Sequence, residues 1–350
     1  MKARPIDRTV REMDVERDLL EALQPFRGFV LAAQLQTFLA SGLYDELEAA
    51  GEGGARVEEL CERGGRDPER LTALLWYLVT EDYLAERGGC FRLTPRSRRV
   101  AVFRAWYEMM IGGYGATFLQ LGAKLERGAG PAARDGARVG SGSCGISLFD
   151  SIPIVRRLLE GVRCDRALDL GCGSAVYLTE LCRWRPSCTA VGVEPDPGAY
   201  RAALAEVEGA GLSERIQVVN ADALRFLEAM TDQPDVVILA FVAHEVLGQE
   251  SEQGVRRLLG MLFERAPDTA LVVIEVDHRV TEANTMRHAL ATTYYNAYYL
   301  MHPFTRQRLM PAAYWEELFE SCGLRIAGKE TTDAGMDSTG LEIGYLLRRS

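Results

Sequence analysis

An acidic residue and two glycines stand where an α/β protein could hold a small ligand. Asp169, Gly171 and Gly173 lie in the segment RALDLGCGSAV, in which an apolar run ends in a glycine turn and an amphipathic pattern begins. A strand, turn and helix in this order bring a ligand close to main-chain N–H groups and to a helix N-terminus. Dinucleotides and S-adenosylmethionine (SAM) are both bound by turns of this kind.

The spacing favours SAM over a dinucleotide. The dinucleotide fingerprint requires a third glycine three residues after the second, and Val176 stands at that position. Asp169 falls at the end of the expected strand, where a carboxylate suits a cationic amino-acid group better than a pyrophosphate. SAM is therefore the expected cofactor.

Two further expected strands also end in acidic residues. Glu194 ends CTAVGVE, and a carboxylate there can accept both ribose hydroxyls. Asp222 ends RIQVVNAD, where it could meet the adenine amino group. Any one of these carboxylates could be an ordinary cap, but three at successive strand ends predict a cofactor site. The expected neighbours of the cofactor are Ala223, Leu224, Phe226 and Phe241.

His244 and Glu245 follow the fourth expected strand, just beyond the cofactor residues. An imidazole takes or gives a proton near neutral pH and also binds metals. His302 lies in YYNAYYLMHPF, a segment that is either a pocket wall or ordinary aromatic core. His278 and His288 are interpreted as structural.

The elements that must position these residues form two domains. The pattern predicts helices over 9–23, ended by Pro25, and over 28–51, then two shorter helices and a hairpin turning at Gly88 and Gly89. This order predicts a winged helix within residues 1–127. The helix expected over 66–82, which would be the recognition helix, is mainly apolar and carries little positive charge, which favours packing in a homodimer over DNA binding.

Residues 128–147 are rich in Gly, Ala and Ser and are predicted to be a linker. From 148 to 350 strands and helices alternate, which predicts a doubly wound, parallel α/β sheet closed by an antiparallel last strand. Ligands bind such sheets at the carboxyl ends of the strands.

The composition of the chain argues against two classes of partner, nucleic acids and membranes. The formal net charge of -10 disfavours binding to nucleic acid, and no apolar stretch approaches the roughly 20 residues of a membrane helix. The eight cysteines form no C-x-x-C pair, which is typical of reduced thiols. We therefore expect a cytoplasmic protein with neither a nucleic-acid nor a membrane partner.

With these motifs the sequence resembles the class I SAM-dependent methyltransferases of small molecules that carry an N-terminal winged-helix dimerisation domain. Asp169, Gly171 and Gly173 match the family motif that holds the SAM amino acid, with Ala175 in place of the usual third glycine. The O-methyltransferase branch has a His-Asp pair after strand four. The matching pair here is His244-Glu245, so the resemblance implies that His244 is a general base.

The segments PFRGFVLA, GGYGATFLQ and GSCGIS resemble the 2-ketoarginine enzymes among the α-keto acid C-methyltransferases. His244 and His302 fall where the phenylpyruvate enzyme of that group has two iron-binding histidines. The resemblance implies methyl transfer to C3 of 2-ketoarginine through an enolate, for the synthesis of 3-methylarginine or a related amino acid. It also implies a metal, iron by analogy, on His244 and His302.

A metal chelated by the keto and carboxylate oxygens of the acceptor would stabilise the enolate as a Lewis acid. Glu245 would orient a ligand or water, and Arg134 is the candidate for binding the acceptor carboxylate. The guanidinium tail requires carboxylates, and the candidates are Asp333, Asp337 and Glu108.

Two other functions stay open. An O-methyltransferase acting on a phenolic metabolite would use His244 as a base without a metal. A SAM-binding winged-helix regulator would need a basic recognition helix, which this chain lacks.

Overall fold

The computed structural model describes residues 15–350, which form two units, one ending at Tyr107 and the other spanning Glu108–Ser350. The boundary thus precedes the linker predicted at 128–147. Gly136–Ser147 of that segment is helix α8, which begins at Asp135, whose side chain caps the Arg138 N–H. Glycine and alanine are tolerated in α8 because it packs closely: a Cβ on Gly142 would lie 2.5 Å from the Met109 nitrogen.

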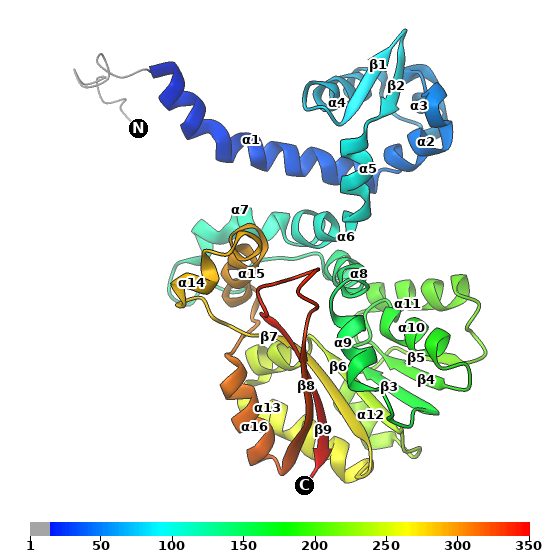
Figure 1. The fold of residues 1–350 in the computed structure, drawn as a ribbon, viewed down its shortest axis with the longest axis vertical. Coiled ribbons are helices and arrows are strands. Elements are labelled where there is room, and N and C mark those ends of the chain that lie inside the picture. Colours follow the sequence, from blue (N-terminus) through cyan, green and yellow to red (C-terminus); the bar gives the residue numbers. More distant parts are fainter. Residues whose placement is uncertain (1–14) are drawn as a thin grey trace. The chain divides into compact units, whose positions relative to one another are not determined.

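Within residues 15–107, the N-terminal unit contains six helices, one short 3-10 turn and a two-stranded hairpin (Figure 1). The elements are α1 (Val15–Ala40), α2 (Leu43–Ala50), η2 (Gly51–Gly53), α3 (Val57–Gly64), α4 (Pro68–Thr80), β1 (Leu84–Arg87), β2 (Cys90–Leu93), α5 (Pro95–Val102) and α6 (Arg104–Tyr107). Asp67 caps α4 by accepting from the Arg70 N–H. The hairpin turns at Gly88 and Gly89, as predicted. The winged-helix assignment itself stays a prediction.

Helix α1 differs from the expectation, because it continues through Pro25 instead of ending there. Residues 9–14 of the predicted first helix lie outside the described residues. A proline inside a helix removes one hydrogen bond. The following turns bury Leu35, Phe38 and Leu39 in the core of the unit, and this packing favours one continuous helix.

The second unit contains a seven-stranded sheet in the order β5-β4-β3-β6-β7-β9-β8. The strands are β3 (Arg166–Leu170), β4 (Thr189–Val193), β5 (Ile216–Val219), β6 (Val236–Ala240), β7 (Ala270–Val276), β8 (Leu324–Thr331) and β9 (Glu342–Arg349). Strands β5, β4, β3, β6 and β7 are parallel, and β9 is antiparallel to both of its neighbours. The prediction of a doubly wound sheet with an antiparallel last strand is confirmed.

Helices cover both faces of this sheet. One face packs on α9 (Ser151–Leu158), α10 (Val176–Trp184) and α11 (Pro197–Gly209), and the other on α12 (Ala223–Ala229), α13 (Ala243–Arg265) and α16 (Ala312–Ser321). The central strands are apolar on both faces; β7, for example, is buried along its whole length. This is the pattern of a parallel sheet between two helical layers.

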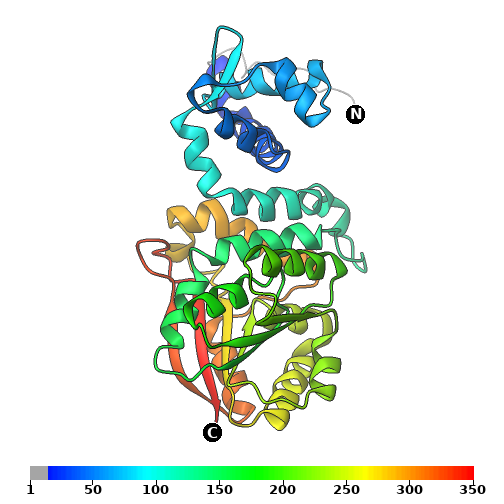
Figure 2. The ribbon, with the colours of Figure 1, turned by 90° about the vertical axis from the view of Figure 1, so that its right-hand side faces the viewer.

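The remaining short elements gather at one end of the sheet (Figure 2). They are η3 (Glu108–Gly113), α7 (Gly115–Lys124), α8, α14 (Ala283–Met286), η4 (Ala291–Tyr295), α15 (Asn296–Met301) and η5 (His302–Thr305). The last four follow the carboxyl end of β7, the edge at which ligands bind in α/β sheets. Among residues 15–350, no helix is both long and apolar enough to cross a membrane.

Candidate active site

The turn after β3 contains two glycines whose positive φ angles and close neighbours leave little room for a side chain. Gly171 and Gly173 have φ angles of +81° and +54°. A Cβ on Gly171 would lie 2.6 Å from Val242 Cγ2, and one on Gly173 would lie 3.0 Å from Cys144 Sγ. The turn therefore keeps its main chain bare, as a ligand that approaches the backbone requires.

Asp169 lies at the end of β3 and is 1% exposed. Its Oδ2 atom is buried and has no hydrogen-bond partner within residues 15–350. Burial, with a smaller contribution from the charge of Glu194, raises the pKa of Asp169 to about 8. A buried carboxylate without a partner is costly, and a cationic group would compensate it. The α-amino group of SAM is such a cation.

Glu194 is also buried and holds the glycine turn in place. Its Oε2 accepts from the Gly173 N–H at 2.9 Å, and its Oε1 accepts from the Asp196 N–H at 2.9 Å. Burial raises the pKa of Glu194 above its usual value. The predicted bond to a ribose would add to these contacts.

Asp222 is exposed and caps α12, accepting from the N–H groups of Leu224 and Arg225 at 2.9 and 3.2 Å. Ala223 is the first residue of that helix. Phe241 follows β6 in the left-handed region, with φ of +57°, and its N–H donates to the Ile274 carbonyl. For these three residues the contact with the cofactor stays a prediction.

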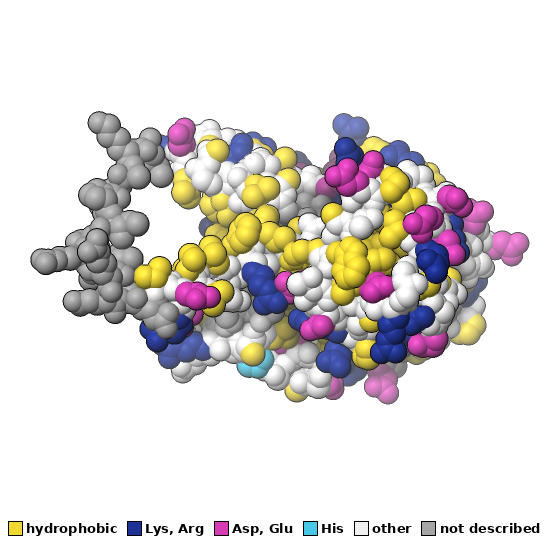
Figure 3. Space-filling view, turned by 90° about the horizontal axis from the view of Figure 1, so that it is seen from above, with side chains coloured by type: hydrophobic (Ala, Val, Ile, Leu, Met, Phe, Trp, Pro, Cys, Tyr) yellow, Lys and Arg dark blue, Asp and Glu magenta, His cyan; other side chains and the backbone are white. Residues whose placement is uncertain are grey.

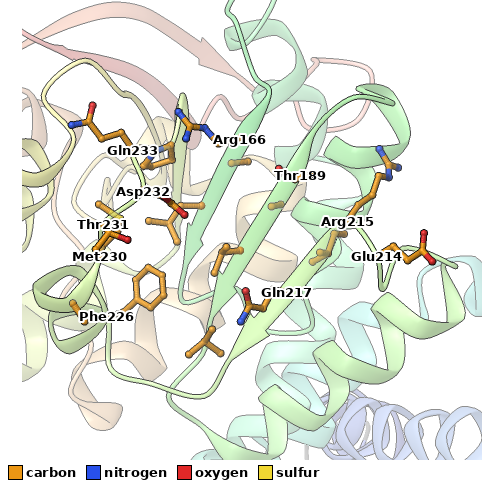
Figure 4. A pocket seen from close by; sticks show the side chains of 18 of the residues that line it. Arg166, Thr189, Glu214, Arg215, Gln217, Phe226, Met230, Thr231, Asp232 and Gln233 are labelled. Carbon is orange, nitrogen blue, oxygen red and sulfur yellow. The ribbon is translucent and has the colours of Figure 1, made fainter.

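A cavity of about 470 Å³ opens on the sheet beside α12 (Figure 4). It is lined by residues at the beginnings of strands, such as Arg166 and Thr189, and by Phe226. The carboxylates Asp169, Glu194 and Asp222 do not line it. Phe226 therefore faces this cavity, and the expected cofactor site lies at the other strand ends.

His244 is hydrogen-bonded to Glu275, a residue that was not predicted from the sequence. Its Nδ1 lies 2.8 Å from Glu275 Oε2, and its main-chain N–H donates to Glu275 Oε1 at 3.0 Å. Both residues are buried, at 2% and 0% exposure. Burial alone would lower the pKa of His244, but the Glu275 carboxylate outweighs it and raises this pKa. A Glu inside the apolar strand ALVVIEV was the signal that could have identified it.

His302 lies next to His244, with 5.2 Å between the ring centroids. Its Nδ1 lies 2.5 Å from the Tyr298 carbonyl oxygen, which can only accept. Burial, followed by the neighbouring His244, holds the pKa of His302 well below its usual value. The ring is therefore neutral, with the proton on Nδ1 and a lone pair on Nε2.

Arg134 and Glu245, the other two expected catalytic residues, form an ion pair of 2.9 Å between Nη1 and Oε1. Gln307 Nε2 donates to the same Glu245 oxygen at 2.7 Å, and Gln307 lies 3.5 Å from His244 Nε2. The tertiary structure thus brings together all four residues predicted for catalysis, and it adds Gln307. Burial would raise the pKa of Glu245, but Arg134 and His244 lower it.

The carboxylates considered for a guanidinium tail are not grouped. Asp333 is exposed and accepts from the Gly335 N–H, and Glu108 forms an ion pair with Arg138. Only Asp337 is buried, and its Oδ2 accepts from the Tyr295 hydroxyl at 2.6 Å. Within residues 15–350 there is no group of three or more His, Cys, Asp or Glu side chains that could hold a metal ion.

Comparison with known proteins agrees with this geometry. Residues 167–264 match the family model described as "Methyltransferase domain". The chain is 39% identical over 342 residues to 2-ketoarginine methyltransferase from Streptomyces arginensis, covering 95% of this chain and 97% of the relative. It is also 31% identical over 182 residues to indolepyruvate C-methyltransferase from Streptomyces griseus, covering 49% of this chain and 51% of that enzyme.

The fold is shared with solved methyltransferases. Human N-acetylserotonin methyltransferase in complex with SAM superposes with a TM-score of 0.68, at 17% identity, covering 100% of both chains. The likeness between the folds confirms the expected methyltransferase fold, and the identity to the Streptomyces arginensis enzyme along nearly the full chain confirms the expected family. The chain belongs to the SAM-dependent methyltransferases and, within them, to the α-keto acid C-methyltransferase type.

Proposed function

We propose that the enzyme transfers the methyl group of SAM to C3 of an α-keto acid and that 2-ketoarginine is the acceptor. The observation that carries this proposal is the pair of buried imidazoles, His244 and His302, beyond the carboxyl edge of the sheet. The relative that is 39% identical bears the name 2-ketoarginine methyltransferase, which supports the choice of acceptor.

The chemistry requires a proton to leave C3 and the resulting negative charge to be stabilised on the keto oxygen. Bound SAM supplies an electrophilic methyl group for that carbon. In our proposal Asp169 holds the cofactor amino group, and Glu194 and Asp222 hold the ribose and the adenine. Arg134 uses only Nη1 in its bonds to Glu245 and Tyr114, so the rest of its guanidinium can bind the acceptor carboxylate.

The two histidines fit a metal ion. Each Nδ1 is engaged, by Glu275 in one ring and by the Tyr298 carbonyl in the other, so each Nε2 can act as a ligand. A carboxylate or carbonyl partner of this kind orients the histidines of many metal sites. We propose that His244 and His302 hold one ion, iron by analogy, which would stabilise the enolate oxygen as a Lewis acid.

A second function is favoured by one specific contact. The bond between His244 and Glu275 raises the pKa of the imidazole, which suits a general base. With His244 as base and no metal, the same site would methylate the hydroxyl of a phenol. Glu245 would then position Gln307 and Arg134, to which it is bonded, around the acceptor.

Mass spectrometry of reactions with SAM and a panel of acceptors separates the two functions. The panel contains 2-ketoarginine, phenylpyruvate and several phenols. We expect the fastest turnover with 2-ketoarginine, and a product methylated at C3. Faster turnover of phenylpyruvate would show that the acceptor is a keto acid other than 2-ketoarginine. Faster turnover of a phenol would support the O-methyltransferase function.

Metal analysis of protein purified without a histidine tag tests the ion. We expect about one equivalent in the wild type, its loss in His302→Ala, and loss of activity on chelation. If chelated enzyme keeps full activity and His302→Ala loses little, the metal proposal is wrong and His244 acts as the general base.

We also propose a homodimer formed through the N-terminal unit. Six large hydrophobic side chains on α1 are 47% to 65% exposed: Val15, Leu19, Leu20, Leu23, Phe26 and Phe29. Figure 3 shows hydrophobic side chains at the surface along this helix. A group of exposed apolar side chains along one helix is typical of an interface. In the proposed dimer, α1 of a second copy of the chain would cover these side chains.

A further inference from the structure

A pair of carboxyl groups is buried in the C-terminal unit. Asp150 precedes α9 and is 7% exposed, and Glu342 begins β9 and is 3% exposed. Within residues 15–350, no Lys or Arg forms a salt bridge with either one. Buried charges are normally paired, so this arrangement needs an explanation.

The two carboxyl groups differ in their hydrogen-bond partners. Asp150 Oδ1 accepts from the N–H and the hydroxyl of Ser151, at 2.5 and 3.0 Å. Glu342 Oε1 is buried and has no hydrogen-bond partner in the described chain. Burial raises the pKa of Asp150 to about 6, while burial, the charge of Asp150 and a hydrogen bond between the two side chains affect Glu342, whose pKa is raised well above its usual value. A bound cation would instead favour the ionised form of both groups.

Both carboxyl groups line one narrow cavity of about 20 Å³, which is space for one water molecule, so its side-chain walls must move apart to admit a larger group. Its other walls include the rings of Phe241, Tyr294 and Tyr298 and the side chains of Ile146 and Val276. The rings of Tyr294 and Tyr298 lie 5.8 Å apart and are tilted by 41°. A cavity with aromatic walls and acidic groups matches a flat, delocalised cation, because guanidinium stacks on aromatic faces and bonds carboxylates in a bidentate fashion. The apolar side chains suit the methylene groups that precede such a cation.

The cavity adjoins the proposed reaction site. Tyr298 lines it and also contacts His302, through its carbonyl and with ring centroids 4.1 Å apart. Val276 pairs with Glu342 in the sheet and directly follows Glu275, the partner of His244. In 2-ketoarginine, four bonds, or roughly 5 Å, separate C3 from the guanidinium carbon. A tail of this length would let one acceptor engage both regions.

We propose that Asp150 and Glu342 bind the guanidinium tail of the acceptor and thereby select a cationic α-keto acid. This inference rests on the proposed function, which it deepens by assigning the residues that recognise the tail. Asp337 supports the site indirectly, since it holds the hydroxyl of Tyr295, another residue of the cavity wall. Asp333 and Glu108 take no part.

Glu342→Gln and Asp150→Asn test the assignment with little change in shape, and Asn can still cap α9. The acceptors are 2-ketoarginine and its uncharged analogue 5-ureido-2-oxopentanoate. Glu320→Gln and Asp333→Asn are the matched controls, because both residues are exposed. Thermal melting shows whether each variant is folded.

For each of the two test variants we expect KM for 2-ketoarginine to rise about 10- to 100-fold, with a small change in kcat. KM for the ureido acid should stay the same or fall, and the controls should behave as the wild type. An equal rise for both acceptors would mean a merely structural role and would overturn the proposal. An unchanged KM for 2-ketoarginine would overturn it as well.

Binding of 5-guanidinopentanoate, measured by calorimetry with S-adenosylhomocysteine present, separates this site from the reaction. If the wild type methylates neither keto acid, the proposed function fails. The tail site still stands if the wild type binds this ligand and Glu342→Gln does not. Equal binding by both proteins, or no binding by the wild type, would overturn the tail site.

Discussion

His244 receives two contacts from a single buried carboxylate, since Glu275 Oε2 lies 2.8 Å from the ring Nδ1 and Oε1 accepts the main-chain N–H at 3.0 Å. The carboxylate therefore fixes both the orientation of the ring and the nitrogen that carries the proton. The remaining nitrogen, Nε2, is directed to the acceptor or to a metal ion in our proposals.

Glu275→Gln should lower kcat/KM by about 10- to 100-fold, as is common for residues that orient a catalytic or ligating histidine. The carboxylate raises the pKa of His244, so its removal lowers that pKa. Neutral imidazole then persists to lower pH, and the acidic limb of the pH–rate profile should move to lower pH. A limb that stays in place would show that Glu275 does not set the ionisation of His244. Glu320→Gln is the control.

Asp169→Asn should abolish SAM binding in calorimetry while it stabilises the cofactor-free protein at pH 8. The folded-state pKa of about 8 lies above the ordinary value of 3.8. Between these values the folded state binds more protons than the unfolded state, so the contribution of Asp169 to stability falls as pH rises. Asparagine carries no charge and should gain about 1 to 3 kcal/mol at pH 8.

Thermal melting of both proteins from pH 5 to pH 8.5 checks this prediction. The difference in melting temperature should grow with pH and level off above about pH 8. A variant that is equally stable at every pH, or that binds SAM as tightly as the wild type, would contradict the role of this carboxylate.

Ala175→Gly should stabilise the protein by about 0.5 to 1 kcal/mol, because Ala175 has φ of +63° and glycine adopts that region without a steric penalty. SAM affinity should not fall, since the family usually has glycine here. Urea unfolding measures the change. Ala203→Gly, in the interior of α11, is the matched control and should lose about 1 kcal/mol. Equal losses in the two variants would disprove strain at Ala175.

Replacing Leu19 and Phe26 together by glutamate should convert the proposed dimer into monomers. These residues are 54% and 65% exposed and lie seven residues apart, on one face of α1. Light scattering at micromolar concentration measures the mass. Val102→Glu, at an exposed apolar residue of α5, should remain dimeric. A wild-type monomer would refute the dimer, and a dimeric double variant would place its interface elsewhere.

The sequence by itself determined the glycine turn and the alternation of strands and helices along the chain. Asp169, Gly171 and Gly173 could be placed because a strand end, a positive φ and a helix start depend on residues that are adjacent in the chain. The alternation of strands and helices also predicted the sheet, since each element shows its own apolar period. Two features were not predicted: helix α8, and the continuation of α1 beyond Pro25. In both places tertiary packing outweighs the local helix propensity.

Only the tertiary structure decided which polar groups meet. Glu275 is 31 residues from His244 in the chain, and the local sequence around either residue does not indicate that the two are in contact. Asp150 and Glu342 come together because the start of α9 and the start of β9 reach the same cavity. Which elements become neighbours depends on sheet order and on burial summed over many residues. A buried carboxyl group therefore acquires its partner, or lacks one, only when the whole core forms.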